Sequence, residues 1–396
     1  MTRLWDRGEP LDELVLRYTA GEDHALDERL VSYDVQASAA HAAMLHACGF
    51  LSDVDHAALQ QALTELGAAH ARGEWHVQLA DEDCHTALED RLTARLGEPG
   101  RAIHLGRSRN DQVLVAVRLW LRDELAALAD AAERVATALD GLAARQGALP
   151  LPGYTHQQRA MPSTVALWAG GYAAELRDDA DGLRAARRRA DRNPLGSAAG
   201  YGVPLLALDR EATTRALGFA ATHTPVTAVQ LSRGKAEAGA LFEAALLAQD
   251  LGRLAADLCL FATAEFGFVR LPARFTTGSS MLPQKRNPDV FELARGRTAE
   301  AAAALAEVLG VTAKLPSGYH RDLQLLKKPL FRGLDAAGAT AAVMAHALPE
   351  LVFDEARVRE AMRDPALAAA ERAYQLVRDE GIPFREAFRR VREEGG

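Results

Sequence analysis

The feature that most constrains the fold of this chain is a long segment with a continuous apolar seam. In the segment 226–268 the apolar side chains follow one another in alternating steps of four and three residues: Leu247, Leu251, Leu254, Leu258 and Phe261. This spacing places them on one face of an α-helix and is typical of helices that pack lengthwise against other helices. It predicts a long helix with one buried face.

Three further proline-free segments have the same character, and they span residues 110–149, 163–192 and 291–314. The first of them carries a seam of its own: Leu114, Val117, Leu121, Leu125 and Leu128. Helices of this length exceed the usual globular range. We therefore expect a mainly α fold built on a long-helix bundle, large enough to share its core with neighbouring chains.

Glycine and proline mark two boundaries along the chain. Gly97, Pro99 and Gly100 end a helical N-terminal region, and a small helical unit follows Pro349. The expected domains are an N-terminal helical domain over residues 1–103, a central long-helix bundle over 104–349 and a small C-terminal helical domain over 350–396.

Charge and cysteine usage exclude several classes of protein. The formal net charge of -8 argues against general nucleic-acid binding, which needs a basic surface. No uncharged run is long enough to cross a bilayer, and the N-terminus lacks an apolar targeting segment. Cys48, Cys84 and Cys259 form no CxxC pair, which favours reduced thiols. We expect a cytoplasmic protein that acts on a small molecule and binds neither nucleic acid nor membrane.

The unusual polar residues fall in the loops between the predicted helices, where binding and catalysis are usually found. In IHLGRSRNDQ, Arg107, Ser108, Arg109 and Asn110 precede the helix that starts near residue 110. Guanidinium groups at a helix N-terminus suit a carboxylate or a phosphate. Alternatively, Asn110 or Asp111 caps the helix and the arginines are solvated.

Two more loops carry weaker signals. PGYTHQQRAMP offers the hydroxyl of Thr155 and the imidazole of His156, although a lone histidine is more often structural. PLGSAAGYG (residues 194–202) allows close backbone approach, but its glycines could equally serve helix packing. It does not follow the GxGxxG pattern, so a dinucleotide site is not expected.

The loop TTGSSMLPQKRNPDVFELARGR (residues 276–297) has the strongest signal. Its Gly-Ser-Ser turn supplies backbone N–H donors and the hydroxyl of Ser279, while Lys285 and Asn287 can hold a developing oxyanion. Glu292, just inside the following helix, can orient and charge a histidine from another segment. A simple capped loop does not account for these residues together.

The last polar loop, LPSGYHRDLQLLKKPLF, spans residues 315–331. Tyr319, Gln324 and Lys327 give a phenol, an amide and a cation that could converge on one polar ligand. No metal set is expected, since DEDCH (residues 81–85) lacks ligand spacing and is interpreted as a polar turn. We expect no cofactor.

In the same order along the chain, these motifs resemble those of the argininosuccinate lyase family. GSSMLPQKRNPD is similar to the signature loop of the wider fumarase/aspartase superfamily, and HLGRSRNDQ points to the lyase family within it. LWDRG near the start, YDVQAS at 33–38 and GIPFREA near the end are similar too, so the likeness covers almost the whole chain.

The resemblance implies a fold, a reaction and a set of roles. The fold is a homotetramer with a twenty-helix core and active sites that each combine loops of three chains. The reaction is the reversible elimination of fumarate from argininosuccinate to give L-arginine, the last step of arginine biosynthesis. The implied catalytic residues are Ser279, His156, Glu292, Lys285 and Asn287. The implied substrate-binding residues are Thr155, Arg107, Ser108, Arg109, Asn110, Tyr319, Gln324 and Lys327.

Some positions depart from the family pattern. Leu105, Leu325 and Leu326 replace polar residues, TAGED at 19–23 lacks an Asn-x-Ser feature, and LSRGK lacks acidic residues around Arg233. The C-terminal unit is also shorter than usual. Two alternatives therefore stay open: a sister lyase that releases fumarate from another N-substituted aspartate, such as adenylosuccinate, and a non-catalytic relative that keeps only the scaffold.

Overall fold

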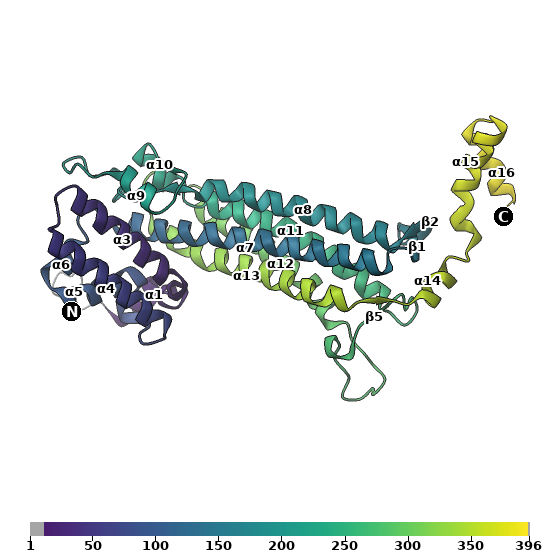
Figure 1. Cartoon of the computed structure of the whole chain (residues 1–396), viewed down its shortest axis with the longest axis horizontal. Coiled ribbons are helices and arrows are strands. Elements are labelled where there is room, and N and C mark those ends of the chain that lie inside the picture. Colours follow the sequence, from purple (N-terminus) through teal and green to yellow (C-terminus); the bar gives the residue numbers. More distant parts are fainter. Residues whose placement is uncertain (1–11, 395–396) are drawn as a thin grey trace. The chain divides into compact units, whose positions relative to one another are not determined.

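The computed structural model describes residues 12–394, so the LWDRG match lies outside the described residues. As the sequence predicts, the chain is mainly helical (Figure 1). It divides into two compact units. The first comprises residues 1–126, 185–240 and 304–331, and the second comprises 127–184, 241–303 and 332–396. None of the described helices is long and apolar enough to span a membrane.

Five long helices each contribute a part to both units. They are α7 (Arg109–Gln146), α8 (Val165–Ala190), α11 (Lys235–Phe261), α12 (Asp289–Thr312) and α13 (Lys327–Ala347). The sequence predicts the first four of these helices, and the ends of α7, α8 and α12 lie close to those expected, whereas α11 is shorter than predicted at both ends.

The remaining elements of the first unit are two helices of 17 and 19 residues, α3 and α4, several shorter helices and one pair of short strands. The helices are α1 (Glu13–Ala20), α2 (Asp23–Leu26), η1 (Asp27–Leu30), α3 (Val31–Ala47), α4 (Asp53–Ala71), η2 (Leu79–Asp81), α5 (Cys84–Leu96), α6 (Glu98–Ala102), α9 (Arg210–Ala216), α10 (Val226–Leu231) and η4 (Arg321–Leu326). The parallel strands are β3 (Arg192–Asn193) and β4 (Ala221–Thr222). An apolar core that includes Leu45, Leu59, Leu63 and Leu88 joins α3, α4 and α5.

The second unit adds a hairpin, a strand pair and the C-terminal helices. The antiparallel strands are β1 (Pro150–Thr155) with β2 (Gln158–Thr164), and β5 (Val269–Arg270) with β6 (Val352–Phe353). The helices are η3 (Ala273–Phe275), η5 (Leu348–Glu350), α14 (Glu355–Ala361), η6 (Pro365–Ala368), α15 (Ala369–Glu380) and α16 (Phe384–Glu394).

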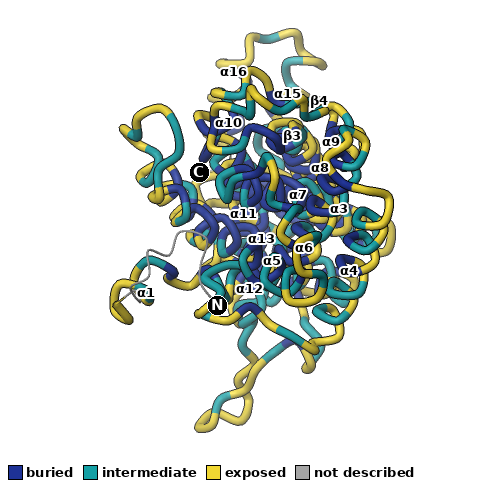
Figure 2. Tube along the Cα trace, turned by 90° about the vertical axis from the view of Figure 1, so that its left-hand side faces the viewer, coloured by how far each residue is buried: buried dark blue, intermediate teal, exposed yellow. Residues whose placement is uncertain are grey.

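The predicted seam of α11 is the buried face of that helix. Leu247, Leu251, Leu254 and Leu258 are each 0% exposed, and buried segments run along α7, α11 and α13 in Figure 2. The helices approach one another closely here. A Cβ atom at Gly252 of α11 would lie 2.4 Å from Thr298 Cγ2 of α12, so only glycine fits that position.

Two local structures differ from the sequence prediction. The segment 226–268 is not one helix, because α10 ends at Leu231 and α11 starts at Lys235. Between them Gly234 has a φ of +85° and lies so close to Thr312 that a Cβ atom would be 2.4 Å from its Cγ2 atom. The segment 151–162, expected to be an irregular connector, belongs to the β1–β2 hairpin, which closes with a two-residue turn.

Candidate active site

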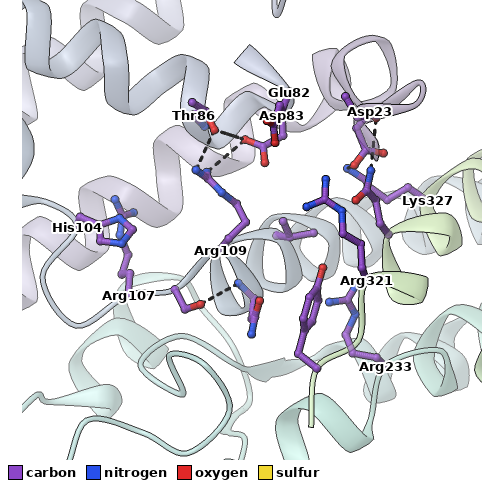
Figure 3. Close-up of a pocket in the computed structure, with 16 residues that line it drawn as sticks. Asp23, Glu82, Asp83, Thr86, His104, Arg107, Arg109, Arg233, Arg321 and Lys327 are labelled. Atoms are coloured by element: carbon purple, nitrogen blue, oxygen red, sulfur yellow. Dashed lines mark hydrogen bonds and ion pairs between the residues drawn. The ribbon is translucent and has the colours of Figure 1, made fainter. Parts of the chain in front are cut away.

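A pocket of about 380 Å³ lies in the first unit, and its lining brings together seven of the residues that the sequence singles out (Figure 3). They are Arg107, Ser108, Arg109, Asn110, Tyr319, Gln324 and Lys327. The two groups come from loops about two hundred residues apart in the chain. Tertiary structure therefore joins the start of α7 to the segment that leads into α13.

The two arginines before α7 are held by different partners. Arg109 Nη1 lies 3.2 Å from Asp83 Oδ1, and Arg109 Nη2 donates to Thr86 Oγ1 at 2.9 Å. Figure 3 shows Arg109 turned toward this pair. Although burial by itself raises the pKa of Asp83, the charge of Arg109 brings that pKa below its ordinary value. Arg107 is buried and donates to Ser38 Oγ at 2.8 Å.

Asp111 is the side chain that organises the start of α7. Its Oδ1 atom accepts from the backbone N–H of Ser108 at 2.9 Å. Its Oδ2 atom accepts from the N–H groups of Gly196 and Ala198 at 2.9 and 2.7 Å. Asp111 thus draws the PLGSAAGYG loop against the helix, and the side chain of Asn110 is not needed as a cap. Of the two alternative caps, Asp111 takes this role and Asn110 lies inside the helix, and the two arginines are partnered rather than solvated.

The segment 319–327 is tied to the C-terminal end of α1 and to the short helices α2 and η1. Gln324 Nε2 donates to the carbonyl oxygens of Thr19 and Ala20 at 2.9 and 3.4 Å. Lys327 is 3% exposed, and its Nζ atom lies 2.6 Å from Asp27 Oδ1 and 2.9 Å from Asp23 Oδ2. These two polar groups of the segment are therefore already engaged by the protein.

Sequence reasoning missed the carboxylates of this pocket. Asp23 and Asp83 line the pocket, and Asp27 forms an ion pair with Lys327, which also lines it. Asp83 caps α5, since its Oδ1 atom accepts from Thr86 N at 2.8 Å. DEDCH, which the sequence analysis interprets as a polar turn, thus takes part in an ionic network through Asp83 and His85. The local composition of DEDCH indicates a cap. The pairing of Asp27 with Lys327, 300 residues later in the chain, leaves no local signal.

Asp27, Cys84 and His85 each offer one ligand atom, and these atoms lie within 4.8 Å of one another. All three residues are buried, and the side chains of Asp27 and His85 lie in ion pairs, whereas His85 Nε2 has no hydrogen-bond partner among the described residues. Asp27 accepts from Lys327 and from Cys84 N, and His85 Nδ1 lies 2.9 Å from Asp34 Oδ1. The cluster has the chemistry of an ion-pair network.

The second unit contains an open groove of about 1290 Å³, which is lined by Lys285, Asn287 and Glu292. Gln157 from the hairpin and Trp168 from α8 lie on the same lining. Lys285 and Glu292 are exposed, and Asn287 is half-buried. The groove therefore presents a cation, an amide and a carboxylate to the surroundings.

Backbone hydrogen bonds join the two ends of the Gly-Ser-Ser loop, and most residues between them are exposed. Thr277 and Asn287 exchange two backbone hydrogen bonds of 3.3 and 2.9 Å. Ser279 Oγ accepts from the N–H groups of Met281 and Leu282 at 3.2 and 3.1 Å. In Figure 1 this segment is the long loop before α12. The serine hydroxyl is thus held as an acceptor and can still donate its own proton.

Thr155 and His156 lie at the exposed end of the hairpin. His156 and Gln157 form its two-residue turn, with φ values of +54° and +60°. Both central residues of this turn type need positive φ, and Asn-Gly is the usual choice. Non-glycine residues in this conformation are strained and cluster at functional sites.

The structure thus gathers the sequence-predicted residues in separate groups. Seven line the pocket of the first unit, three line the groove of the second, and Thr155, His156 and Ser279 lie outside both linings. Among the described residues no hydrogen bond or ion pair joins His156 to Glu292 or to Ser279.

Comparison with known proteins places the chain among lyases. A family pattern described as "Lyase" matches residues 9–302. The argininosuccinate lyase of Sorangium cellulosum (strain So ce56) is 49% identical over 392 residues, which cover 99% of this chain and 90% of that protein. The argininosuccinate lyase of Thermotoga neapolitana is 39% identical over 394 residues, which cover 100% of this chain and 98% of that protein. The second alignment includes the C-terminal helical region of this chain.

The fold is similar to that of the class II fumarase from Schistosoma mansoni. The two structures have a TM-score of 0.77 over 95% of this chain and 91% of the fumarase, at 16% identity. At this identity the likeness concerns the fold: the long helices belong to the fumarase/aspartase type.

Proposed function

The chain belongs to the argininosuccinate lyase family, and from this we propose that it catalyses the reversible elimination of fumarate from argininosuccinate to give L-arginine. The observation that carries the proposal is the 49% identity to the Sorangium enzyme over 99% of the chain. The aligned region includes all the catalytic and substrate-binding residues that the sequence predicts. The activity is that of a carbon–nitrogen lyase in arginine biosynthesis, with no cofactor and no metal.

The difficult step is the removal of a proton from the carbon next to a carboxylate. It produces a dianionic aci-carboxylate, which is costly in water and needs donors already in place. Lys285, Asn287 and the N–H groups of the Gly-Ser-Ser loop are suited to that role. We assign Ser279 to the proton at carbon.

The second step breaks the carbon–nitrogen bond. The electron pair of the bond leaves with the guanidino nitrogen, a double bond forms between the two central carbons of the succinyl part, and fumarate results. We assign His156, polarised by Glu292, to the proton that the leaving nitrogen takes up. The strained turn at His156 supports a functional constraint there.

Binding is divided between the two ends of the substrate. We assign Arg107, Ser108, Arg109, Asn110 and Thr155 to the succinyl carboxylates, because guanidinium and amide donors hold carboxylates in a fixed orientation. We assign Tyr319, Gln324 and Lys327 to the compartment of the arginine end. All of these residues except Thr155 line one pocket, which supports a shared binding site.

We further propose a cytoplasmic homotetramer whose active sites each combine three chains. Five long helices in each of four copies would make a twenty-helix core. Long helices of the second unit expose large apolar side chains, including Leu167 (69%), Phe242 (50%) and Leu293 (64%), which suit burial against other copies. In this assembly the hairpin and the Gly-Ser-Ser loop of neighbouring copies complete the pocket. The division into domains 1–103, 104–349 and 350–396 is part of the same proposal.

The test is a fumarate assay with purified protein. Argininosuccinate is the substrate, adenylosuccinate and aspartate are run beside it, and ultraviolet absorbance reports the product. We expect a rise with argininosuccinate alone. A rise with another substrate would favour the sister lyase, and no rise from a folded tetramer would favour the non-catalytic scaffold. Light scattering at micromolar concentration measures the assembly, and a monomer would contradict it.

A further inference from the structure

The carboxylate of Asp111 joins the start of α7 to Gly196, which lies 85 residues later in the chain. Asp111 is 0% exposed and does not line the pocket itself. Its Oδ1 atom accepts from the N–H group of Ser108, and its Oδ2 atom accepts from the N–H groups of Gly196 and Ala198. Both carboxylate oxygens are therefore used, one for each segment.

On the side of Oδ1, the bond fixes the turn that leads into α7. Ser108 precedes the helix and Asp111 is its third residue, so the side chain reaches back as in one half of a capping box. The carbonyl oxygen of Ser108 accepts in turn from Asp111 N at 3.1 Å. Ser108 lines the pocket. Its orientation there therefore depends on Asp111.

On the side of Oδ2, the bonds hold the loop 194–202. The φ angle is positive at every second residue of this loop, namely at Gly196, Ala198, Gly200 and Gly202. Such alternation turns backbone N–H groups toward one point and makes a concave anion site, and here the anion is Asp111 Oδ2. Ala198 keeps a φ of +50°, which is strained for alanine and persists only where the surrounding contacts impose it.

The loop is connected to the pocket through Asn110. Asn110 Nδ2 donates to the carbonyl oxygen of Ala199 at 3.3 Å, and Gln230 Nε2 donates to Asn110 O at 3.4 Å. A Cβ atom at Gly200 would lie 3.1 Å from Gln230 Cγ, so the loop packs closely on Gln230. Asn110 lines the pocket. Its side chain is thus oriented by a carbonyl group of the loop that Asp111 holds.

We propose that Asp111 is a positioning residue for substrate binding: through Ser108 and through the loop 196–199 it aligns two pocket groups that receive the succinyl carboxylates. The inference rests on the proposed lyase function, which assigns Ser108 and Asn110 to those carboxylates. A carboxylate suits this position because it accepts on both sides, whereas an amide has one acceptor oxygen and keeps only one of the two attachments. Hydrogen bonds to an ionised acceptor are also stronger than neutral ones.

The alternative is that Asp111 only supports the fold, in which case its loss should weaken all ligands equally. Two ligands separate these roles. Succinate carries the two carboxylates without the guanidino part of the substrate, and arginine carries the guanidino part without them. Burial raises the pKa of Asp111 to about 6, against the effect of the three N–H groups and of Arg107. Calorimetric titrations at pH 8 therefore keep the carboxylate ionised.

Asp111→Asn should raise the Kd for succinate by about tenfold or more, the usual effect of losing hydrogen bonds to a charged group. The Kd for arginine should stay within about threefold of wild type, because the residues assigned to that end do not contact Asp111. A thermal melt checks the fold. Equal losses for the two ligands, or an unchanged Kd for succinate, would contradict the inference.

Gly200→Ala tests the loop without altering the carboxylate, and it decides the matter if Asp111→Asn does not fold. Gly200 has a φ of +119° and lies against Gln230, so a methyl group fits only if the loop next to the Ala199 carbonyl shifts. The Kd for succinate should rise by about threefold or more, and the Kd for arginine should not. An unchanged Kd for succinate in this variant would show that the loop does not orient Asn110.

Asp209 provides a matched control. It caps α9 in the same unit, where its Oδ1 atom accepts from Ala212 N at 3.0 Å, but it is exposed and does not line the pocket. Asparagine caps a helix about as well as aspartate, so Asp209→Asn should leave both Kd values within about twofold of wild type. A wild-type protein that binds succinate but makes no fumarate from argininosuccinate would overturn the proposed function alone, because the titration does not depend on turnover. A protein that binds no succinate would overturn both.

Discussion

The ammonium nitrogen of Lys327 lies 2.6 Å from Asp27 Oδ1, and both side chains are buried. The pair joins the start of α13 to the short helix η1, 300 residues earlier in the chain. Burial of Lys327 opposes its charge, but Asp27 and Asp23 raise its pKa above the ordinary range. The cation is therefore part of the structure at any physiological pH.

Loss of this cation should destabilise the protein. Lys327→Met leaves two carboxylates buried without compensation, and breaking a buried pair from one side costs about 3–5 kcal/mol. Chemical denaturation measures the change in the free energy of unfolding. The exposed neighbour Lys328 is the control, since Lys328→Met should change stability by less than about 1 kcal/mol. Equal small effects of the two variants would show that the buried pair contributes little.

Ser279→Ala should abolish most of the turnover and leave the fold unchanged. The hydroxyl is half-buried in an open loop, so its removal creates no cavity in the core. If Ser279 exchanges the proton at carbon, kcat should fall about a thousandfold or more. Fumarate release gives the rate, and circular dichroism with a thermal melt checks the fold. Near-normal turnover would remove Ser279 from the mechanism.

The hairpin turn allows the catalytic and structural roles of His156 to be separated. Asparagine tolerates positive φ better than most residues, so His156→Asn should keep the turn. It should nevertheless lower kcat by about 10²–10⁴-fold, the usual contribution of a general acid or base. Turnover within a few fold of wild type would argue that the histidine is retained for the turn.

Gln157 offers the complementary experiment. Its φ of +60° is strained for glutamine and unstrained for glycine. Gln157→Gly should therefore stabilise the protein by about 1 kcal/mol, seen as a higher melting temperature. A lower melting temperature would indicate that contacts of the glutamine side chain outweigh the backbone strain.

The carboxyl group of Asp179 on α8 should make stability depend on pH. Its pKa is raised from 3.8 to about 7 by burial and then by neighbouring carboxylates: Asp250, Asp178, Glu243 and Glu175. Asp179 Oδ2 has no hydrogen-bond partner in the described part of the chain. Because the folded state binds this proton more tightly than the unfolded state, the stabilisation is complete below pH about 4 and is lost as the pH rises through about 7.

Asp179→Asn removes the charge and tests whether stability falls as the pH rises. The variant should be more stable than wild type at pH 8 by about 1–2 kcal/mol, a value reduced for solvent screening, and the difference should vanish near pH 4. Denaturation at both pH values measures it. Asp181, exposed on the same helix and paired with Arg184, provides the control Asp181→Asn, with little dependence on pH. If wild type were more stable than Asp179→Asn at pH 8, the predicted direction of the pH dependence would be wrong.

The helices and the polar loops could be predicted from the sequence because their signals are local. The seam from Leu247 to Phe261 repeats at the period of a helix, and burial of that face follows directly. Arg109 and Asn110 stand where a long helix begins, and a helix start is marked by neighbouring residues. The family resemblance rests on such local motifs as well.

Tertiary structure decided what depends on contacts between distant segments. The break between α10 and α11 coincides with Gly234, which has a positive φ and lies against Thr312, and the strained turn at His156 closes the β1–β2 hairpin; neither leaves a periodic pattern. The same holds for Asp23, Asp27 and Lys327, whose pairing brings together segments about 300 residues apart in the chain. Sequence by itself determined which segments are helices and which loops hold chemistry, because backbone periodicity is local. Only the folded chain decided which charges neutralise one another, because electrostatic pairing depends on distance in space.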